Sequence, residues 1–500
     1  MQANTSPSSL SESSSEKLPL FQRVIYGTGD WGRASFNTLR QFFYAIFLTD
    51  VVGLDPRLAS FAALISIIWD AINDPIIGAV SDNVRTRWGR RRPFLLLFAV
   101  PFALAFLLLW WAPPWETQVM LMIHVTLAYM VSDTIQTLIT VPYLALTPEL
   151  APTYDGRTSL TSMRMFFNLV ASLVTAVAAP SIMDGALHAG LTQQQAYITI
   201  AAIFGGAAIL PYLVIFFVVK EKQPTENIQT ESYTFRGTLK LLWQNTPFKF
   251  ATGIYVLNWI AFDIEGLMLP FFLLYIVAQG DLLAKVDLFG ASIALESVVF
   301  GVLLLVATLS IPIWNRLAHR FSKRSAYIIG MAFWIVVQMF VFSIQAGQIQ
   351  LIIVLAALAG LSVSTAHIMP EAIFPDVIDW DELRTNKRHE GMYYGAINFI
   401  RKLSSAIATF IALQALGWFG YQSPPANTET FMQPDQAISA IRFITGPVIA
   451  LMLLFAILFA WKYPLSRERQ KKIRTMLNRR KNRKAARLHP TVSSDISPKM

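Results

Sequence analysis

The chain of 500 residues contains no cysteine. This absence excludes disulfides, thiolate zinc sites, cysteine nucleophiles and thiolate-bound iron–sulfur clusters. Charged residues are also scarce, at 14% of the chain, whereas ordinary globular domains contain roughly 25%. Hydrophobic residues make up 54%, and they include 35 Phe and 13 Trp. This composition excludes a water-soluble chain of several domains.

Long apolar runs divide the sequence. Each reaches or approaches the roughly 20 residues that a helix needs to cross a bilayer. The first 25 residues are polar and rich in Ser, without the apolar stretch of a secretory signal. We therefore predict an all-α polytopic membrane protein with twelve transmembrane helices, near residues 26–53, 58–80, 93–111, 119–144, 161–182, 197–219, 250–277, 288–314, 326–344, 350–374, 391–416 and 441–463.

A polar segment at residues 220–249 separates six runs from the other six. A faint repeat supports two related halves, because a basic hairpin follows both the second run (Arg87 to Arg91) and the eighth run (Arg320 to Arg324). Two six-helix halves around a midplane site form the architecture of one large transporter class. The predicted parts are a disordered polar tail (1–25), an amino-terminal bundle (26–219), a linker (220–249), a carboxy-terminal bundle (250–463) and a basic tail (464–500).

The positions of Lys and Arg predict the orientation. If both termini are cytoplasmic, 33 of the 41 basic residues lie in the inward segments, and only Arg57 and Lys285 lie in outward loops. Basic residues remain on the cytoplasmic side during insertion, so both termini are expected there. The net charge of +10 is then a topology signal and gives no reason to expect a nucleic-acid partner. Two alternatives are open for the basic tail, which are contact with anionic lipid headgroups and simple solvation.

Two carboxylates lie inside the second apolar run. Asp70, Asn73 and Asp74 are spaced i, i+3 and i+4, so they share one helical face. Adjacent buried carboxylates repel each other, and a bound cation or a proton relieves this repulsion. We predict that Asp70 and Asp74 bind Na⁺ or H⁺. The alternative is that they pair with basic residues of neighbouring helices.

Other charged residues also fall within apolar runs. Lys402 in the eleventh run is the expected partner of the carboxylates in the second run, either as a coupling residue or as a salt-bridge partner. Asp263 and Glu265 lie in the seventh run and face different directions, and either could have a substrate or proton role. The remaining site candidates are the arginines in or at the ends of apolar runs, Arg33, Arg40, Arg164 and Arg401.

One motif of soluble proteins is present. Residues 27–32 match G-x-G-x-x-G, which binds dinucleotides only between a strand and a helix of a βαβ unit. Here the motif opens an apolar helix. We expect its glycines to permit close helix packing instead.

Six segments of the sequence form a familiar pattern. They are Tyr26 to Asp30, Trp69 to Pro75, Arg85 to Pro93, Val141 to Tyr143, Asp376 to Trp380 and Phe399 to Leu403. Together they resemble the glycoside–pentoside–hexuronide:cation symporters of the major facilitator superfamily, and the resemblance covers residues 20–463. The second and third of these segments, taken together, are the most specific.

The resemblance implies roles for individual residues. Asp70, Asn73, Asp74 and Thr137 fall on cation-binding positions, and Lys402 on a coupling position. Arg164 falls on a sugar-binding position, and we also expect Arg33, Thr140 and Asn398 to contact the substrate. The alternative for Arg164 is that it only pairs with a neighbouring acid such as Asp30. Two carboxylates of the galactoside transporters are replaced by Ala34 and Thr140, and a nearby tryptophan by Leu144. Because carboxylates are strong acceptors for sugar hydroxyls, we expect a neutral or acidic glycoside rather than a galactoside.

The predicted function is secondary active transport, in which uptake of a sugar or glycoside is coupled to Na⁺ or H⁺ by alternating access. A lysophospholipid transporter of the same superfamily is the alternative, and a receptor or scaffold without transport is the alternative of another class. We expect no enzyme activity, no cofactor besides the coupling ion, and a monomer in the plasma membrane in contact with lipid. Asp82, Arg85 and Arg91 in the basic hairpin are expected to help close the cytoplasmic side in one state. The alternative is that this cluster only sets the topology.

Overall fold

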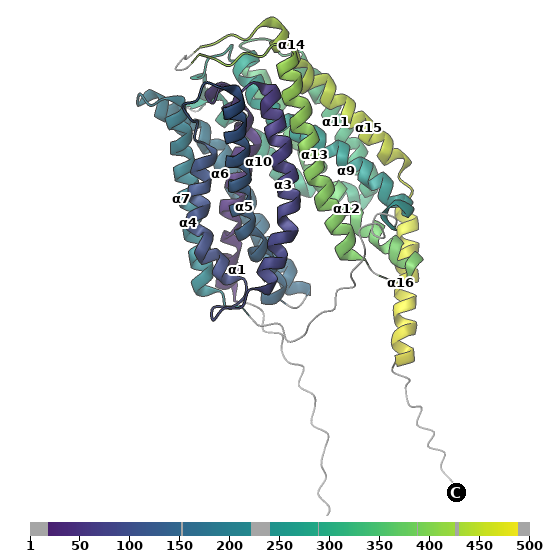
Figure 1. The fold of residues 1–500 in the computed structure, drawn as a ribbon. Helices are drawn as coiled ribbons and strands as arrows, with labels where there is room; N and C mark the ends of the chain where they lie inside the picture. The colour runs from purple at the N-terminus through teal and green to yellow at the C-terminus, as the bar shows by residue number, and fades with distance from the viewer. Residues whose placement is uncertain are drawn as a thin grey trace, which may run out of the picture.

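The computed structural model describes residues 19–151, 154–221, 241–288, 290–387, 389–425 and 430–488. Helices make up nearly all of this part (Figure 1). The first half contains α1 (Leu20–Thr28), α2 (Asp30–Ile46), the π-helical segment η1 (Phe47–Val51), α3 (Pro56–Asn83), α4 (Arg92–Leu109), α5 (Gln118–Leu150), α6 (Tyr154–His188) and α7 (Gln193–Val218).

The second half has the same plan, with one small hairpin added. It contains α9 (Thr246–Phe272), η2 (Leu273–Val277), β1 (Lys285–Leu288), β2 (Ala291–Ala294), α10 (Leu295–Arg320), α11 (Lys323–Phe342), α12 (Ile349–Thr385), α13 (Glu390–Trp418), α14 (Asp435–Phe443), η3 (Ile444–Val448) and α15 (Ile449–Lys462). A last helix, α16 (Arg467–Leu488), follows the bundle.

Within the described residues, eleven helical stretches are long and apolar enough to cross a membrane. The first span completes the predicted twelve. It is divided at Gly29 into α1 and α2, and η1 continues it. Figure 1 shows the two halves side by side, with α3 facing α13.

The contacts between the halves support the predicted repeat. α3 packs against α13, α6 against α10, and α2 against α9. In span numbers these pairs are 2 with 11, 5 with 8, and 1 with 7. If each span is replaced by its counterpart in the other half, so that span 1 becomes span 7 and the reverse, the pair 2 with 11 becomes the pair 8 with 5. The pair 1 with 7 is unchanged. This symmetry is expected for two related six-helix units.

Some helix ends differ from the prediction. The eighth span begins at Leu295 rather than 288, because residues 285–294 form the antiparallel hairpin of β1 and β2. Gly290 allows the turn, with φ at +84°. Helix α1 begins at Leu20, inside the predicted tail, and most of the basic tail that follows residue 464 is the helix α16. Residues 222–240 of the predicted linker lie outside the described residues.

The glycines of residues 27–32 lie at helix contacts, as predicted. A Cβ atom on Gly29 would lie 2.6 Å from the ring of Tyr143 in α5, and one on Gly32 would lie 2.6 Å from the Cβ of Ala208 in α7. The segment is therefore packed between helices, with no space for a pyrophosphate at either glycine.

Candidate functional site

A cavity of about 440 Å³ lies between the two halves. The side chains that line it come from α2, η1, α3 and α5 of the first half and from α9 and α13 of the second half. Most of its charged lining residues are those that the sequence places inside apolar runs. The polar lining residues are Arg33, Asn37, Arg40, Gln41, Tyr44, Asp70, Tyr129, Asp263, Arg401, Lys402, Ser405 and Thr409.

The predicted cation-binding residues meet at one side of this cavity. The Lys402 ammonium forms ion pairs with Asp70 at 2.7 Å and with Asp74 at 2.6 Å. It donates hydrogen bonds to the Asp74 carboxylate and to the backbone carbonyl oxygen of Asp70. Thr137 Oγ1 on α5 donates to the other oxygen of Asp74 at 3.2 Å. Asn73 is buried, and its side-chain nitrogen has no hydrogen-bond partner among the described residues. The two carboxylates are therefore in contact with Lys402, and Asp74 is also in contact with Thr137, another predicted cation ligand.

Sequence reasoning missed Asp133. It lies on α5 and is buried, and Arg40 Nη1 on α2 donates to it at 3.3 Å. The guanidinium of Arg40 also lies 5.1 Å from the ring centroid of Tyr129. The signal was available, because Asp133 lies inside the fourth apolar run in the same way that Asp70 lies inside the second.

Another ion pair that lines the cavity joins α13 to α9. Arg401 on α13 makes two hydrogen bonds to Asp263 on α9, at 2.6 and 2.8 Å, and its guanidinium lies 3.9 Å from the ring centroid of Trp259. Glu265 faces away from the cavity and accepts a hydrogen bond from Gln338 on α11. Asp263 therefore belongs to the cavity, whereas Glu265 does not.

Arg164 lies behind the wall. It donates to Asp30 at 2.6 Å, and Arg33 binds the other oxygen of the same carboxylate at 2.9 Å. Asp30 has no exposed surface, and Tyr143 also donates to it at 3.3 Å. Arg164 is itself buried and does not line the cavity, whereas Arg33 does. Of the two arginines that bind Asp30, Arg33 is therefore the one that a solute in the cavity can contact.

Two other predicted substrate residues do not reach the cavity in this conformation. Thr140 is half-buried, and Asn398 is exposed on α13. Neither lines the cavity as described. Their roles in substrate binding stay predictions.

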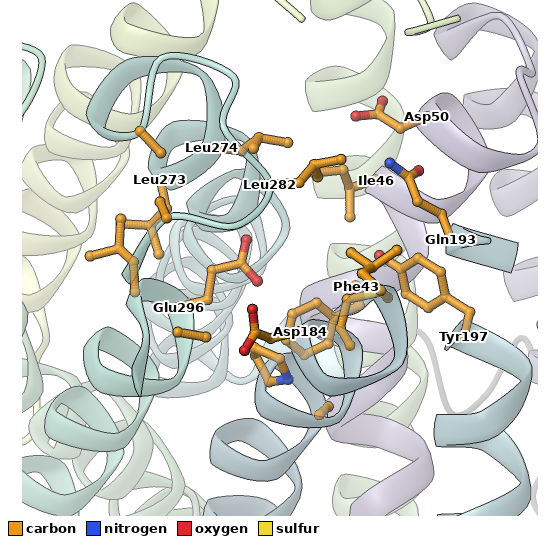
Figure 2. Close-up of a pocket in the computed structure, with 18 of the residues that line it drawn as sticks. Phe43, Ile46, Asp50, Asp184, Gln193, Tyr197, Leu273, Leu274, Leu282 and Glu296 are labelled. Carbon is orange, nitrogen blue, oxygen red and sulfur yellow. The ribbon is translucent and has the colours of Figure 1, made fainter. Parts of the chain in front are cut away.

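At the end opposite the basic segments, the halves are joined by hydrogen bonds. Asp50 in η1 accepts hydrogen bonds from Tyr275 in η2 and from Tyr421, and the latter is 2.5 Å long. Gln414 on α13 donates to Ser60 on α3 at 2.8 Å. Single π-helical turns often mark functional positions, and here two of them supply the closing contact. Figure 2 shows Asp50 at the edge of a smaller cavity of about 80 Å³, toward which Asp184 and Glu296 also point.

The cytoplasmic end shows a different pattern. Arg91 pairs with Asp82 at 3.1 Å and with Glu149 at 3.1 Å, all within the first half. Glu221 accepts hydrogen bonds from the backbone N–H groups of Arg90 and Arg91, which fixes the hairpin to the end of α7. Among the described residues, no hydrogen bond or ion pair joins the halves at this end. The hydrogen bonds and ion pairs described between the halves thus lie toward the outer end and around the cavity, and a closing role for Asp82, Arg85 and Arg91 stays a prediction.

We expect Asp50→Ala to open the outer side. Losing hydrogen bonds to a charged group should shift the equilibrium between states by roughly tenfold or more. Because the chain has no cysteine, Ser405→Cys in the cavity gives a single labelling site. A membrane-impermeant maleimide added from outside should then label the Asp50→Ala variant roughly tenfold faster. Glu116→Ala, at an exposed outer position, is the matched control. Equal labelling rates would contradict a closing role for Asp50.

The fold and this cavity define a multi-pass membrane transporter with two related six-helix halves. A family model described as "MFS/sugar transport protein" matches residues 25–467, and the chain belongs to this family of the major facilitator superfamily. The predictions of the superfamily, of the twelve-helix fold, and of a plasma-membrane transporter rather than an enzyme are therefore confirmed.

Similar proteins include several symporters. The chain is 29% identical to the uncharacterized symporter sll1374 of Synechocystis, over 93% of this chain and 98% of the relative. It is 26% identical to the sodium-dependent lysophosphatidylcholine symporter 1 of Gallus gallus (94% and 90% covered). It is 25% identical to the putative glycoside/cation symporter YagG of Escherichia coli (89% and 92% covered).

Solved transporters share the fold. A bacterial homologue of the lysosomal transporter Spinster, in an inward-facing conformation, gives a TM-score of 0.61 at 11% identity, over 91% of this chain and 96% of the other. The xylose transporter XylE of Escherichia coli, in an inward-open conformation, gives 0.58 at 14% identity, over 91% and 99%.

Proposed function

We propose that this protein is a symporter that couples uptake of an acidic glycoside to one Na⁺ or H⁺ per cycle. The observation that carries the proposal is the charge balance of the cavity. Two carboxylates, Asp70 and Asp74, share the single ammonium of Lys402. This group therefore keeps one uncompensated negative charge, which is costly at membrane depth and attracts a monovalent cation.

The residues that would supply ligands for that cation lie together. A Na⁺ ion prefers the oxygens that Asp70, Asp74 and the hydroxyl of Thr137 offer, and the same carboxylates can accept a proton. The unpartnered nitrogen of Asn73 fits this role, because rotation of the amide would present its oxygen instead. Lys402 holds the position between the carboxylates until a cation competes for them. Cation binding then frees or moves the ammonium, which couples the site to helix α13.

A second group of charged residues carries the opposite charge. Asp30 is shared by two arginines, Arg33 and Arg164, so this group keeps one uncompensated positive charge. Between these groups, Asp133 with Arg40 and Asp263 with Arg401 form neutral pairs. A solute with one carboxylate or sulfate, bound by the planar donors of Arg33, compensates the positive charge. One cation neutralises the group of Asp70, Asp74 and Lys402, and one anionic solute neutralises the group that contains Arg33. Each group is then neutral in the loaded transporter.

The rest of the cavity wall suits a sugar. Asn37, Gln41, Ser405 and Thr409 offer donors and acceptors for hydroxyl groups, and a volume of about 440 Å³ lies within the roughly 300–1,000 Å³ of typical ligand pockets. The second candidate is a lysophospholipid, and the similarity to the sodium-dependent lysophosphatidylcholine symporter favours it. Its acyl chain would need a long apolar wall, whereas twelve of the eighteen residues that line this cavity are charged or polar.

Uptake into proteoliposomes tests the proposal. We expect a labelled acidic glycoside, such as a hexuronide, to accumulate when a Na⁺ or H⁺ gradient is imposed. Melibiose and lysophosphatidylcholine should accumulate much less. Because a neutral complex crosses the membrane, an imposed membrane potential should leave the rate nearly unchanged.

Three results would contradict parts of this proposal. If lysophosphatidylcholine alone accumulates, the substrate is a lysophospholipid and not a glycoside. A rate that rises steeply with membrane potential would contradict the one-to-one charge balance. An absence of counterflow for every solute would favour a receptor or scaffold without transport.

A further inference from the structure

A second large cavity, of about 740 Å³, lies at the cytoplasmic end of the second half, away from the transport cavity. Its walls are the end of α10, the start of α11, the second half of α12, the segment that joins α15 to α16, and the first turns of α16. Helix α16 is held there by packing, because Ile473 and Leu477 are buried, and by Arg474, which binds Asp376 and Asp379. Figure 1 shows α16 beside the end of α12.

Basic side chains outnumber acidic ones on this wall. The charged lining residues are Lys323, Arg324, Asp376, Arg467, Glu468 and Arg474. Asp376 is already bound by Lys323 at 2.8 Å and by Arg474 at 3.5 Å. Arg324 and Arg467 contact only backbone carbonyl oxygens, at 3.5 and 3.1 Å, and neither forms an ion pair within the described part of the chain. Two guanidinium groups therefore remain for an anion.

Two buried donors on the same wall also have no partner. Tyr463 is only 4% exposed, and its hydroxyl group makes no hydrogen bond among the described residues. The side-chain nitrogen of Gln470 is buried and likewise lacks an acceptor there. A buried donor without an acceptor is destabilising, so both groups indicate an acceptor that the chain itself does not supply.

The surroundings point to the bilayer interface. Tyr463 directly follows α15, the last spanning helix, and Trp461 beside it is 63% exposed. Phe321, which lines the cavity, is 53% exposed. Exposed aromatic residues at the end of a span are typical of the headgroup region, and basic pockets on this side of a membrane bind anionic headgroups.

We propose that this cavity binds a phosphate group, supplied by the headgroup of an anionic phospholipid in the cytoplasmic leaflet. Arg324 and Arg467 pair with the phosphate oxygens, and Tyr463 and Gln470 donate to them. Because Arg324 lies at the start of α11 and Arg467 at the start of α16, the lipid would link the carboxy-terminal helix to the bundle.

Native mass spectrometry of the purified full-length protein tests this site. We expect retention of dioleoyl phosphatidylglycerol and not of dioleoyl phosphatidylcholine. The double variant Arg324→Gln/Arg467→Gln should bind phosphatidylglycerol roughly thirtyfold more weakly. The control Arg469→Gln/Arg479→Gln removes the same charge from α16 positions outside the cavity, and it should change the affinity by less than about twofold.

A second variant keeps the proposal testable if the double variant folds poorly. Tyr463→Phe removes only the unpartnered hydroxyl, so its melting temperature without lipid should not fall, while its affinity for phosphatidylglycerol should decrease roughly tenfold. In a separate arm, stabilisation by inorganic phosphate, without retention of phosphatidylglycerol, would support the anion site and assign it to a soluble phosphate. Equal retention of both lipids, equal losses in the two double variants, or binding of neither probe would overturn the proposal.

Discussion

Replacing Asp74 by Asn should abolish accumulation of the solute while leaving the protein folded and inserted. The substitution keeps the size of the side chain but removes its charge. Lys402 then balances Asp70 alone, so the group becomes neutral and no longer attracts a cation. With one ion per solute, a hundredfold cation gradient sustains at most about a hundredfold accumulation. We expect this ratio to fall to about one in the variant, because uncoupled exchange only equalises concentrations.

Uptake and counterflow in the same proteoliposomes separate the two steps. Counterflow of labelled solute should persist in Asp74→Asn, since Arg33, Arg401 and the other wall residues remain. Glu116→Asn, which removes an exposed carboxylate from an outer loop, should accumulate solute as the wild type does. Unchanged accumulation driven by Na⁺ or H⁺ in Asp74→Asn would contradict the assignment of the cation site.

Replacing Arg164 by Ala should abolish solute binding, although Arg164 does not line the cavity. Asp30 is fully buried and would lose its 2.6 Å contact with Arg164. A buried charge that loses its partner costs about 3–5 kcal/mol. Arg33 already binds the other oxygen of Asp30, so we expect its guanidinium to turn inward and leave the cavity wall. Cation binding at Asp70 and Asp74 should remain measurable by calorimetry.

A double variant distinguishes this indirect effect from direct contact. Asp30→Asn combined with Arg164→Ala removes the buried charge together with its partner. No buried carboxylate then attracts Arg33, so its guanidinium should remain at the cavity wall. Solute affinity should then recover by at least about tenfold relative to Arg164→Ala. If the double variant binds as poorly as the single variant, Arg164 contacts the solute directly in another state. Unaltered affinity in Arg164→Ala would show that neither arginine recognises the solute in the way proposed.

The buried ion pairs show why the site was only partly predictable. Asp70, Asp74 and Lys402 were found because a charge inside an apolar run needs a partner, and the i, i+4 spacing places both carboxylates on one helical face. The same rule applied to Asp133, which was overlooked. The rule does not give the partner, however. Asp30 lies 134 residues from Arg164 and Lys402 lies 328 from Asp74, so only helix packing brings these groups together.

The sequence by itself determined the twelve spans, their division into two halves, the charge asymmetry between the two sides and the location of most intramembrane charges. These features depend on composition and on the distance that a helix needs to cross a bilayer, which are local properties of the chain. Tertiary structure alone decided that Arg33 rather than Arg164 faces the cavity, and that Asp263 lines it whereas Glu265 does not. It also decided that Asp50 closes the outer side with two tyrosines of the other half. The reason is physical: hydropathy specifies that a helix is buried in the membrane, but the orientation of each face depends on contacts with helices that are distant in the sequence.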